Sequence, residues 1–179
     1  YAINPVFVEY KDLTSLIKDK KVDASATISM EAKDLYYSDT FIKFDNYAIT
    51  RKKDNIKINS IKDLEGKSMI AWHDANKDLG DKFNKLTTNN KLYKEQVLQE
   101  IQVQEFLEGK FQVCIIDKNI FIYNTNNLKF TYHKIFEDFT EFHMGFTDKK
   151  IKTDFNKALA EMKKDGTYEK IINSFISEK

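Results

Sequence analysis

The chain has 179 residues, of which 41% are hydrophobic and 32% are charged, and its formal net charge is +1. This length accommodates one or two domains, and the even mixture of lysines with acids excludes the basic footprint of a protein that binds nucleic acid or an anionic membrane. Cys114 is the single cysteine, which excludes an internal disulfide.

Helical and strand patterns alternate along the chain, which favours largely parallel sheets covered by helices. A capping box is expected at Ser60 and Asp63, and Gly66 ends the short helix that follows it. Up to residue 116 the expected elements are a helix after Asp12, strands at 22–28 and 36–53, the short helix after Ser60, a strand at 67–72, helices at about 76–86 and 97–108, and a strand at 111–116.

The remaining elements are a short helix at 119–123, a strand at 129–133, a strand at 141–150 and two helices separated by Gly166. The apolar stripe of the last helix, which includes Tyr168, Ile172 and Phe175, indicates packing rather than a cofactor site. We expect no cofactor and no metal, because neither a phosphate loop nor a metal-ligand spacing among His73, His133 and His143 is present.

Residues 36–53 and 141–150 predict two strands that pass from one folding unit to another. They divide the chain into lobe 1, residues 1–50 plus 144–179, and lobe 2, residues 51–143. Two lobes joined by two such strands form a hinged cleft, which is suited to capturing a small molecule.

Five stretches, in this order, resemble motifs of the type 2 periplasmic solute-binding proteins, the family that includes the polar amino acid receptors of ABC transporters. They are LIKDKKVDASATI (16–28), YYSDTF (36–41), INSIKDLEGKSMIAW (58–72), FLEGKFQVCIID (106–117) and FNKALAEMKKDGTYEKI (155–171). The resemblance implies an α/β two-lobe fold with two hinge strands, each lobe being a mostly parallel sheet covered by helices. It covers nearly the whole chain, but the first strand and helix of the family are not visible at the start.

The resemblance also implies where ligand-binding residues lie, because ligands of open α/β sheets bind beyond the carboxyl ends of the strands. In lobe 1, Thr27 and Ser29 follow a strand and can offer hydroxyl groups, although a Ser/Thr turn would use them internally. The arginine that grips a ligand carboxylate in the family has no counterpart here. Its place falls near Glu31 and Lys33, and Lys33 can pair with an anion only as a point charge.

In lobe 2, the stretch 71–80 stands where the family has a Gly-Thr turn and a helix start. Trp72, His73, Asp74, Ala75 and Asn76 are the ligand-binding candidates here, with Asp74 or Asn76 as alternative helix N-caps. We expect a ligand acceptor group to face this helix start.

Asp117 ends a strand at the place where family members pair an aspartate with a ligand ammonium, although it can also cap the next helix. Further aromatic wall candidates are Tyr36, Tyr37, Tyr47 and Phe121, most of which are expected to be core residues.

The expected function is that of a monomeric, periplasmic or extracytoplasmic receptor that captures a small polar ligand, a class that includes amino-acid-like molecules, for an ABC transporter permease. One alternative is the ligand-sensing domain of a membrane signalling protein, although the terminal ISEK resembles a natural end and favours the receptor. Another is a dehydratase-like catalytic derivative with Glu31 and Asp117 as acid and base. The sequence contains no nucleophile motif that would support catalysis, so we do not expect the protein to be an enzyme.

Overall fold

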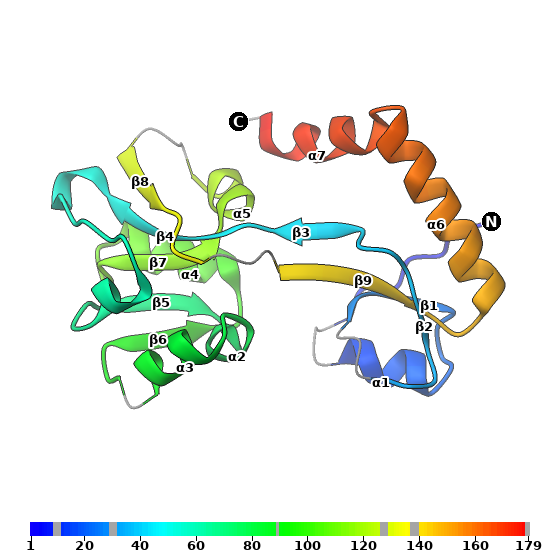
Figure 1. Cartoon of the computed structure of the whole chain (residues 1–179), viewed down its shortest axis with the longest axis horizontal. Coiled ribbons are helices and arrows are strands. Elements are labelled where there is room, and N and C mark those ends of the chain that lie inside the picture. Colours follow the sequence, from blue (N-terminus) through cyan, green and yellow to red (C-terminus); the bar gives the residue numbers. More distant parts are fainter. Residues whose placement is uncertain (9–11, 29–31, 89, 126–128, 137–139, 178–179) are drawn as a thin grey trace. The chain divides into compact units, whose positions relative to one another are not determined.

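The computed structural model describes residues 1–8, 12–28, 32–88, 90–125, 129–136 and 140–177. The chain divides into two compact units: unit 1 contains Tyr1–Lys43 and Glu141–Asn173, and unit 2 contains Phe44–Thr140 and Ser174–Lys179. The α-helices and strands of each unit are labelled in Figure 1.

Unit 2 is built on a five-stranded mixed sheet in the order β6-β5-β7-β4-β8. Its centre is parallel, since β5 pairs in parallel with β6 and with β7, whereas β4 pairs antiparallel with β7 and β8. The strands are β4 (Asn46–Arg51), β5 (Met69–Trp72), β6 (Tyr93–Gln96), β7 (Val113–Asp117) and β8 (Phe130–His133).

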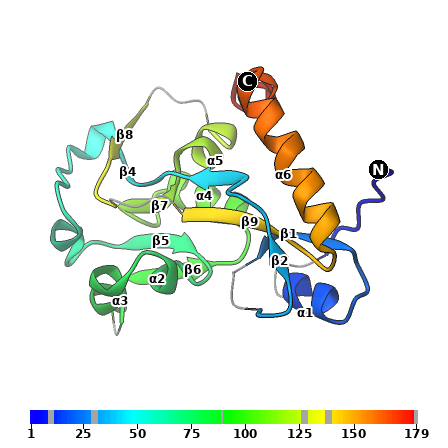
Figure 2. The same cartoon turned by 45° about the vertical axis from the view of Figure 1, so that its right-hand side comes forward.

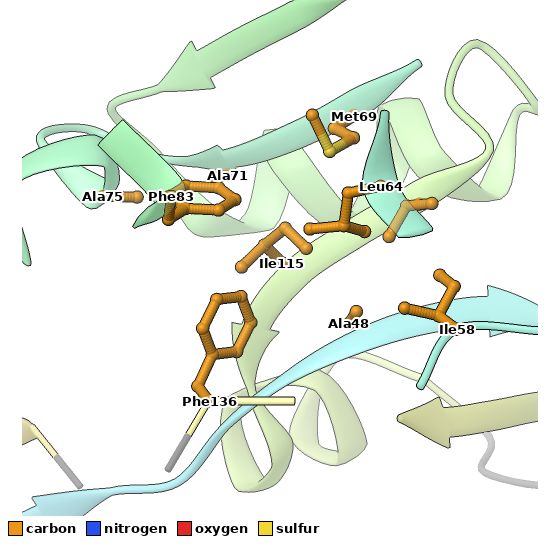
Figure 3. Close-up of a cluster of buried hydrophobic side chains, with 10 residues drawn as sticks. Ala48, Ile58, Leu64, Met69, Ala71, Ala75, Phe83, Ile115 and Phe136 are labelled. Carbon is orange, nitrogen blue, oxygen red and sulfur yellow. The ribbon is translucent and has the colours of Figure 1, made fainter. Parts of the chain in front are cut away.

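The two faces of this sheet bury alternate residues of the same strands, as the period of two in a strand requires. One face carries Met69, Ala71 and Ile115 in a cluster with Phe83 and Leu64 (Figure 3). The opposite face carries Ile70, Cys114 and Ile116 against residues of the following helices. The helices of unit 2 are η2 (Lys52–Asp54), η3 (Ile61–Leu64), α2 (Ala75–Asp78), α3 (Asp81–Thr87), α4 (Gln99–Leu107) and α5 (Lys118–Tyr123).

Unit 1 carries a second sheet, in which β9 lies between β1 and β2 and also pairs with β3. The strands are β1 (Ala24–Ile28), β2 (Tyr36–Tyr37), β3 (Ile42–Phe44) and β9 (Thr140–Phe146), and the helices are α1 (Leu13–Lys18), α6 (Lys149–Lys164) and α7 (Thr167–Ser177). The end of β3, the start of β9 and the last four residues of α7 fall in unit 2. In the views of Figures 1 and 2, α1 and α6 lie on opposite sides of this sheet.

The pairing of β9 differs from the mostly parallel arrangement that was expected for lobe 1. Both β1 and β2 run antiparallel to β9, because β9 is the strand on which the chain returns and it is inserted between them. The α/β character itself agrees with the sequence analysis.

The long strand expected at 36–53 is divided into β2, β3 and β4. Ser38 marks the first break: its backbone N–H donates to Met144 O (2.9 Å), and its hydroxyl oxygen accepts from Met144 N (2.9 Å) while donating to Asp39 O (2.6 Å). The Ser38 hydroxyl thus accepts a hydrogen bond that a backbone carbonyl accepts in a regular strand.

The helix expected at 76–86 is also divided, into α2 and α3, at Gly80 with φ 83°. A positive φ is favourable for glycine and cannot continue a right-handed helix. Among the described residues, none of the helices is both long and apolar enough to cross a membrane.

Candidate functional site

The three parallel strands of unit 2 end at one edge of the sheet, which we call the carboxyl edge: β6 ends at Gln96, β5 at Trp72 and β7 at Asp117. Asn46 of β4 is in register with Asp117, so the start of β4 lies at this edge too. Five of the predicted ligand-binding residues follow each other at the end of β5, and Asp117 lies at the end of the neighbouring strand. This edge is therefore the candidate site of unit 2.

The chain leaves β5 through a sharp turn, residues 73–76, which we call the β5–α2 turn. His73 N donates to Gln96 O (3.1 Å), which ties the start of the turn to β6. Asp74 adopts the left-handed conformation with φ 67°, which aspartate tolerates better than most residues, and α2 begins at Ala75. Asp74 stands at the N-cap, but its side chain makes no capping hydrogen bond.

Two N–H groups of this turn are bound by Glu95, a residue of β6 that is in register with Ala71. Glu95 Oε2 accepts from Asp74 N (2.9 Å), and Oε1 accepts from Asn76 N (3.2 Å) and from the Tyr93 hydroxyl (2.8 Å). A carboxylate of the protein thus occupies the place where a ligand acceptor group was expected. The sequence analysis did not identify Glu95.

The role of Glu95 could have been predicted only from the pairing of the strands, not from the sequence around it. The segment YKEQ forms β6, which was not predicted because it lacks an apolar run. Once β6 is placed parallel to β5 with Ala71 opposite Glu95, an acid beside the next turn follows from the register.

Lys77 balances part of the negative charge around the turn, and His73 lies beside both acids. Lys77 Nζ pairs with Asp74 Oδ1 (2.7 Å), and this hydrogen bond, helped by the nearby His73, lowers the pKa of Asp74. His73 is exposed, with Nδ1 3.7 Å from Glu95 Oε2 and Nε2 3.8 Å from Asp74 Oδ2. The turn therefore holds alternating charges that a polar ligand can contact.

His73, Asp74 and Glu95 each offer a metal-ligand atom, and these atoms lie within 4.8 Å of one another. Imidazole and carboxylate groups suit several divalent cations. However, the two short approaches use different nitrogens of His73, and both acids already have other partners. A metal ion would have to compete with those contacts.

Asp117 is 3% exposed, and its carboxylate is bound to the backbone. Oδ1 accepts from Asn119 N (2.8 Å) and Ile120 N (3.0 Å), which caps α5, while Oδ2 accepts from Asp45 N (2.7 Å). Burial raises its pKa, against the lowering effect of these N–H groups. The capping alternative is therefore realised, and pairing with a ligand ammonium stays a prediction.

The other candidate residues of unit 2 differ in their exposure to solvent. Trp72 is half-buried, donates from Nε1 to Asp78 Oδ2 (3.0 Å) and packs against the Phe83 cluster. Ala75 and Phe121 are completely buried, which leaves them as core residues rather than walls. Asn76 Oδ1 is buried and has no hydrogen-bond partner within the described part of the chain.

The candidates of unit 1 are less well defined. Thr27 lies in β1, Lys33 is exposed in a turn, and Ser29 and Glu31 lie outside the described residues. Tyr37 holds the end of this turn, because its hydroxyl contacts both Ala32 N and Ala32 O at 3.1 Å.

Arg51 has structural partners in unit 2. Its Nε donates to Asp54 Oδ2 (2.8 Å), its Nη1 donates to Phe106 O (2.8 Å), and its guanidinium lies 4.8 Å from the centre of the Phe106 ring. Because Arg51 is the only arginine of the sequence, a two-point arginine clamp on a ligand carboxylate would require these bonds to break.

Comparison with known proteins gives three concordant findings. The family model of the bacterial extracellular solute-binding proteins, family 3, matches residues 1–178. A curated relative, "Probable amino-acid-binding protein YxeM" of Bacillus subtilis (strain 168), is 28% identical over 185 residues, which cover 96% of this chain and 68% of the relative.

Solved structures share the fold. The amino acid ABC transporter substrate-binding protein AbpA of Streptococcus pneumoniae, bound to L-arginine, is 17% identical with a TM-score of 0.73, over 94% of this chain and 74% of that one. The AvGluR1 ligand binding domain in complex with glutamate is 14% identical with a TM-score of 0.71, over 98% and 76% of the two chains. At these identities the likeness shows the fold alone.

Proposed function

The chain belongs to family 3 of the bacterial extracellular solute-binding proteins, and we propose that it captures a small, polar, amino-acid-like molecule outside the cytoplasm and delivers it to an ABC transporter permease. The match of the family model over residues 1–178 carries this proposal. The name of the B. subtilis relative, a probable amino-acid-binding protein, supports the ligand class.

The chemistry of the carboxyl edge agrees with a binding role. Trp72 offers a half-buried ring beside His73, Asp74 and Asn76, so one turn presents apolar surface together with charged and amide groups. Binding sites for small molecules combine these features in the same way. In this proposal the protein binds its ligand and releases it unchanged.

The arginine clamp is the point at which we expect this receptor to differ from an ordinary α-amino acid binder. Since Arg51 is committed to Asp54 and Phe106, recognition of a ligand carboxylate falls to hydroxyl groups such as Thr27 or to Lys33. We therefore propose a ligand that does not depend on a free α-carboxylate held at two points.

Native mass spectrometry of the purified chain, followed by calorimetry with a panel of amino acids and small amines, tests the proposal. We expect one ligand per chain, and a rise in melting temperature that follows the ligand concentration as mass action requires. The proposal fails if no member of the panel binds and no small molecule co-purifies.

The ligand-sensing domain of a signalling protein remains the second candidate, because the AvGluR1 domain has the same fold. Both functions require ligand capture, so calorimetry does not separate them. A pull-down with an ABC transporter permease separates them, since only the transport receptor is expected to bind one.

A further inference from the structure

Glu95 is an acid of unit 2 whose carboxylate is bound by a neighbouring turn. It accepts two backbone N–H groups, from Asp74 at 2.9 Å and Asn76 at 3.2 Å, and one phenol, from Tyr93 at 2.8 Å. Its side chain is 19% exposed, so the carboxylate is held where β6 faces the β5–α2 turn rather than free in solvent.

Convergent backbone N–H groups after a parallel strand are the donors that α/β proteins offer to an anionic group of a ligand. In this turn both donors already point at Glu95. A ligand carboxylate or phosphate would have to replace a side chain that is covalently part of β6 and therefore always present at high effective concentration.

The surroundings of Glu95 strengthen this exclusion. Asp74 places a second carboxylate next to the turn, with its Oδ2 3.8 Å from His73 Nε2. Burial, followed by the hydrogen bond to Glu95, raises the pKa of Tyr93, so its phenol stays a protonated donor at neutral pH. An incoming anion would meet two acids, of which Asp74 is paired with Lys77 (2.7 Å), and would find the phenol donor engaged.

We infer that Glu95 is a specificity-determining residue: it fills the anion position of the β5–α2 turn with the protein's own carboxylate, so that this edge accepts an amine or another hydrogen-bond donor of the ligand and rejects a carboxylate or phosphate. The inference rests on the proposed function, since it concerns what the receptor selects. It replaces the expectation that a ligand acceptor group faces this turn.

Three variants test it. Glu95→Ala removes the carboxylate and frees the two N–H groups, whereas Glu95→Gln keeps the shape and one acceptor oxygen but removes the charge. Glu108→Gln is the matched control, because Glu108 follows α4 just before the start of β7, at the edge opposite the carboxyl edge, and pairs with Lys110 (2.8 Å).

The first measurement needs no native ligand. The backbone amide signals of Asp74 and Asn76 are followed by NMR while sodium acetate is added at constant ionic strength. We expect saturable shifts in Glu95→Ala and none in the wild type or in Glu108→Gln, with acetate bound at least about tenfold more tightly by Glu95→Ala than by the wild type. Saturable shifts in the wild type, or their absence from a folded Glu95→Ala, would overturn the inference.

The second measurement uses calorimetry with the panel of amines and amino acids. In Glu95→Gln we expect amine affinity to fall about tenfold or more relative to carboxylate affinity, while Glu108→Gln keeps the wild-type ratio. An unchanged ratio in a folded Glu95→Gln would contradict the selective role. If the wild type binds nothing in the panel, the proposed function fails, whereas the acetate titration still decides the role of Glu95.

Discussion

Asp117 and Glu95 both bind backbone N–H groups, but the groups they bind lie at different distances along the sequence. Each carboxylate accepts backbone N–H groups beyond the end of a parallel strand, at the same edge of the unit 2 sheet. Through Oδ1, Asp117 binds N–H groups two and three residues ahead of it, and only its Oδ2 reaches a distant group, Asp45 N. Both N–H groups that Glu95 binds lie in a turn, 21 and 19 residues before it in the sequence. The comparison separates local chemistry, which belongs to a short peptide, from chemistry that exists only after β6 has paired with β5.

The largest effect is expected for Asp117→Ala. This change leaves three N–H groups without their acceptor in a nearly buried position, so we expect a loss of about 2–3 kcal/mol in the free energy of unfolding, measured with urea. Asp117→Asn keeps one acceptor oxygen and should lose less.

Measuring the ligand affinity of the same variants shows whether Asp117 binds the ligand in addition to capping α5. We expect Asp117→Ala to weaken affinity at least about tenfold, as removal of one partner of a charged hydrogen bond does. Equal affinity in the wild type and in a folded Asp117→Ala would leave Asp117 as a helix cap alone.

A smaller loss of stability, about 1–2 kcal/mol, is expected for Glu95→Ala. The turn lies at the surface, where water can hydrate the released N–H groups of Asp74 and Asn76. Urea unfolding of Glu95→Ala beside Glu108→Ala measures this difference, and the control should unfold like the wild type. A greater loss for Glu95→Ala than for Asp117→Ala would reverse the comparison.

The smallest effect concerns the Asp74–Lys77 pair, which carries charge beside Glu95 without binding the backbone of the turn through its side chains. Lys77 lowers the pKa of Asp74 from 3.8, so the pair stabilises the folded state above that pH, and this contribution is lost as the pH falls through and below 3.8. Melting curves of Lys77→Met should therefore lie slightly below those of the wild type at pH 7 and meet them in acid. A gap that widens in acid would contradict this assignment.

The same contrast explains which features the sequence could reveal. The cap at Asp117, the contact of Asp63 Oδ2 with Ser60 N (3.0 Å) and the helix break at Gly166 all depend on residues at most a few positions apart. Such signals are readable in a linear sequence because their geometry is fixed by the local backbone.

Features that depend on the sheet could not be read in this way. The segment that forms β6 has three polar residues after Tyr93 and no apolar run, so only its pairing with β5 makes it a strand. The antiparallel position of β9 between β1 and β2 likewise depends on partners more than 100 residues away in the chain. The site candidates of unit 2 lie at or just after the ends of β5 and β7, but the acid that occupies the turn does not belong to the family motifs.

The position of β9 also has a consequence for biosynthesis. All five strands of unit 2 lie between residues 46 and 133, so the ribosome delivers that sheet without interruption, whereas β1 and β2 of unit 1 wait for residues 140–146 before their common neighbour exists. Closing so long a loop is slow compared with local pairing. We therefore expect unit 2 to fold before unit 1 during synthesis, and the early residues of unit 1 to stay unpaired until β9 is made.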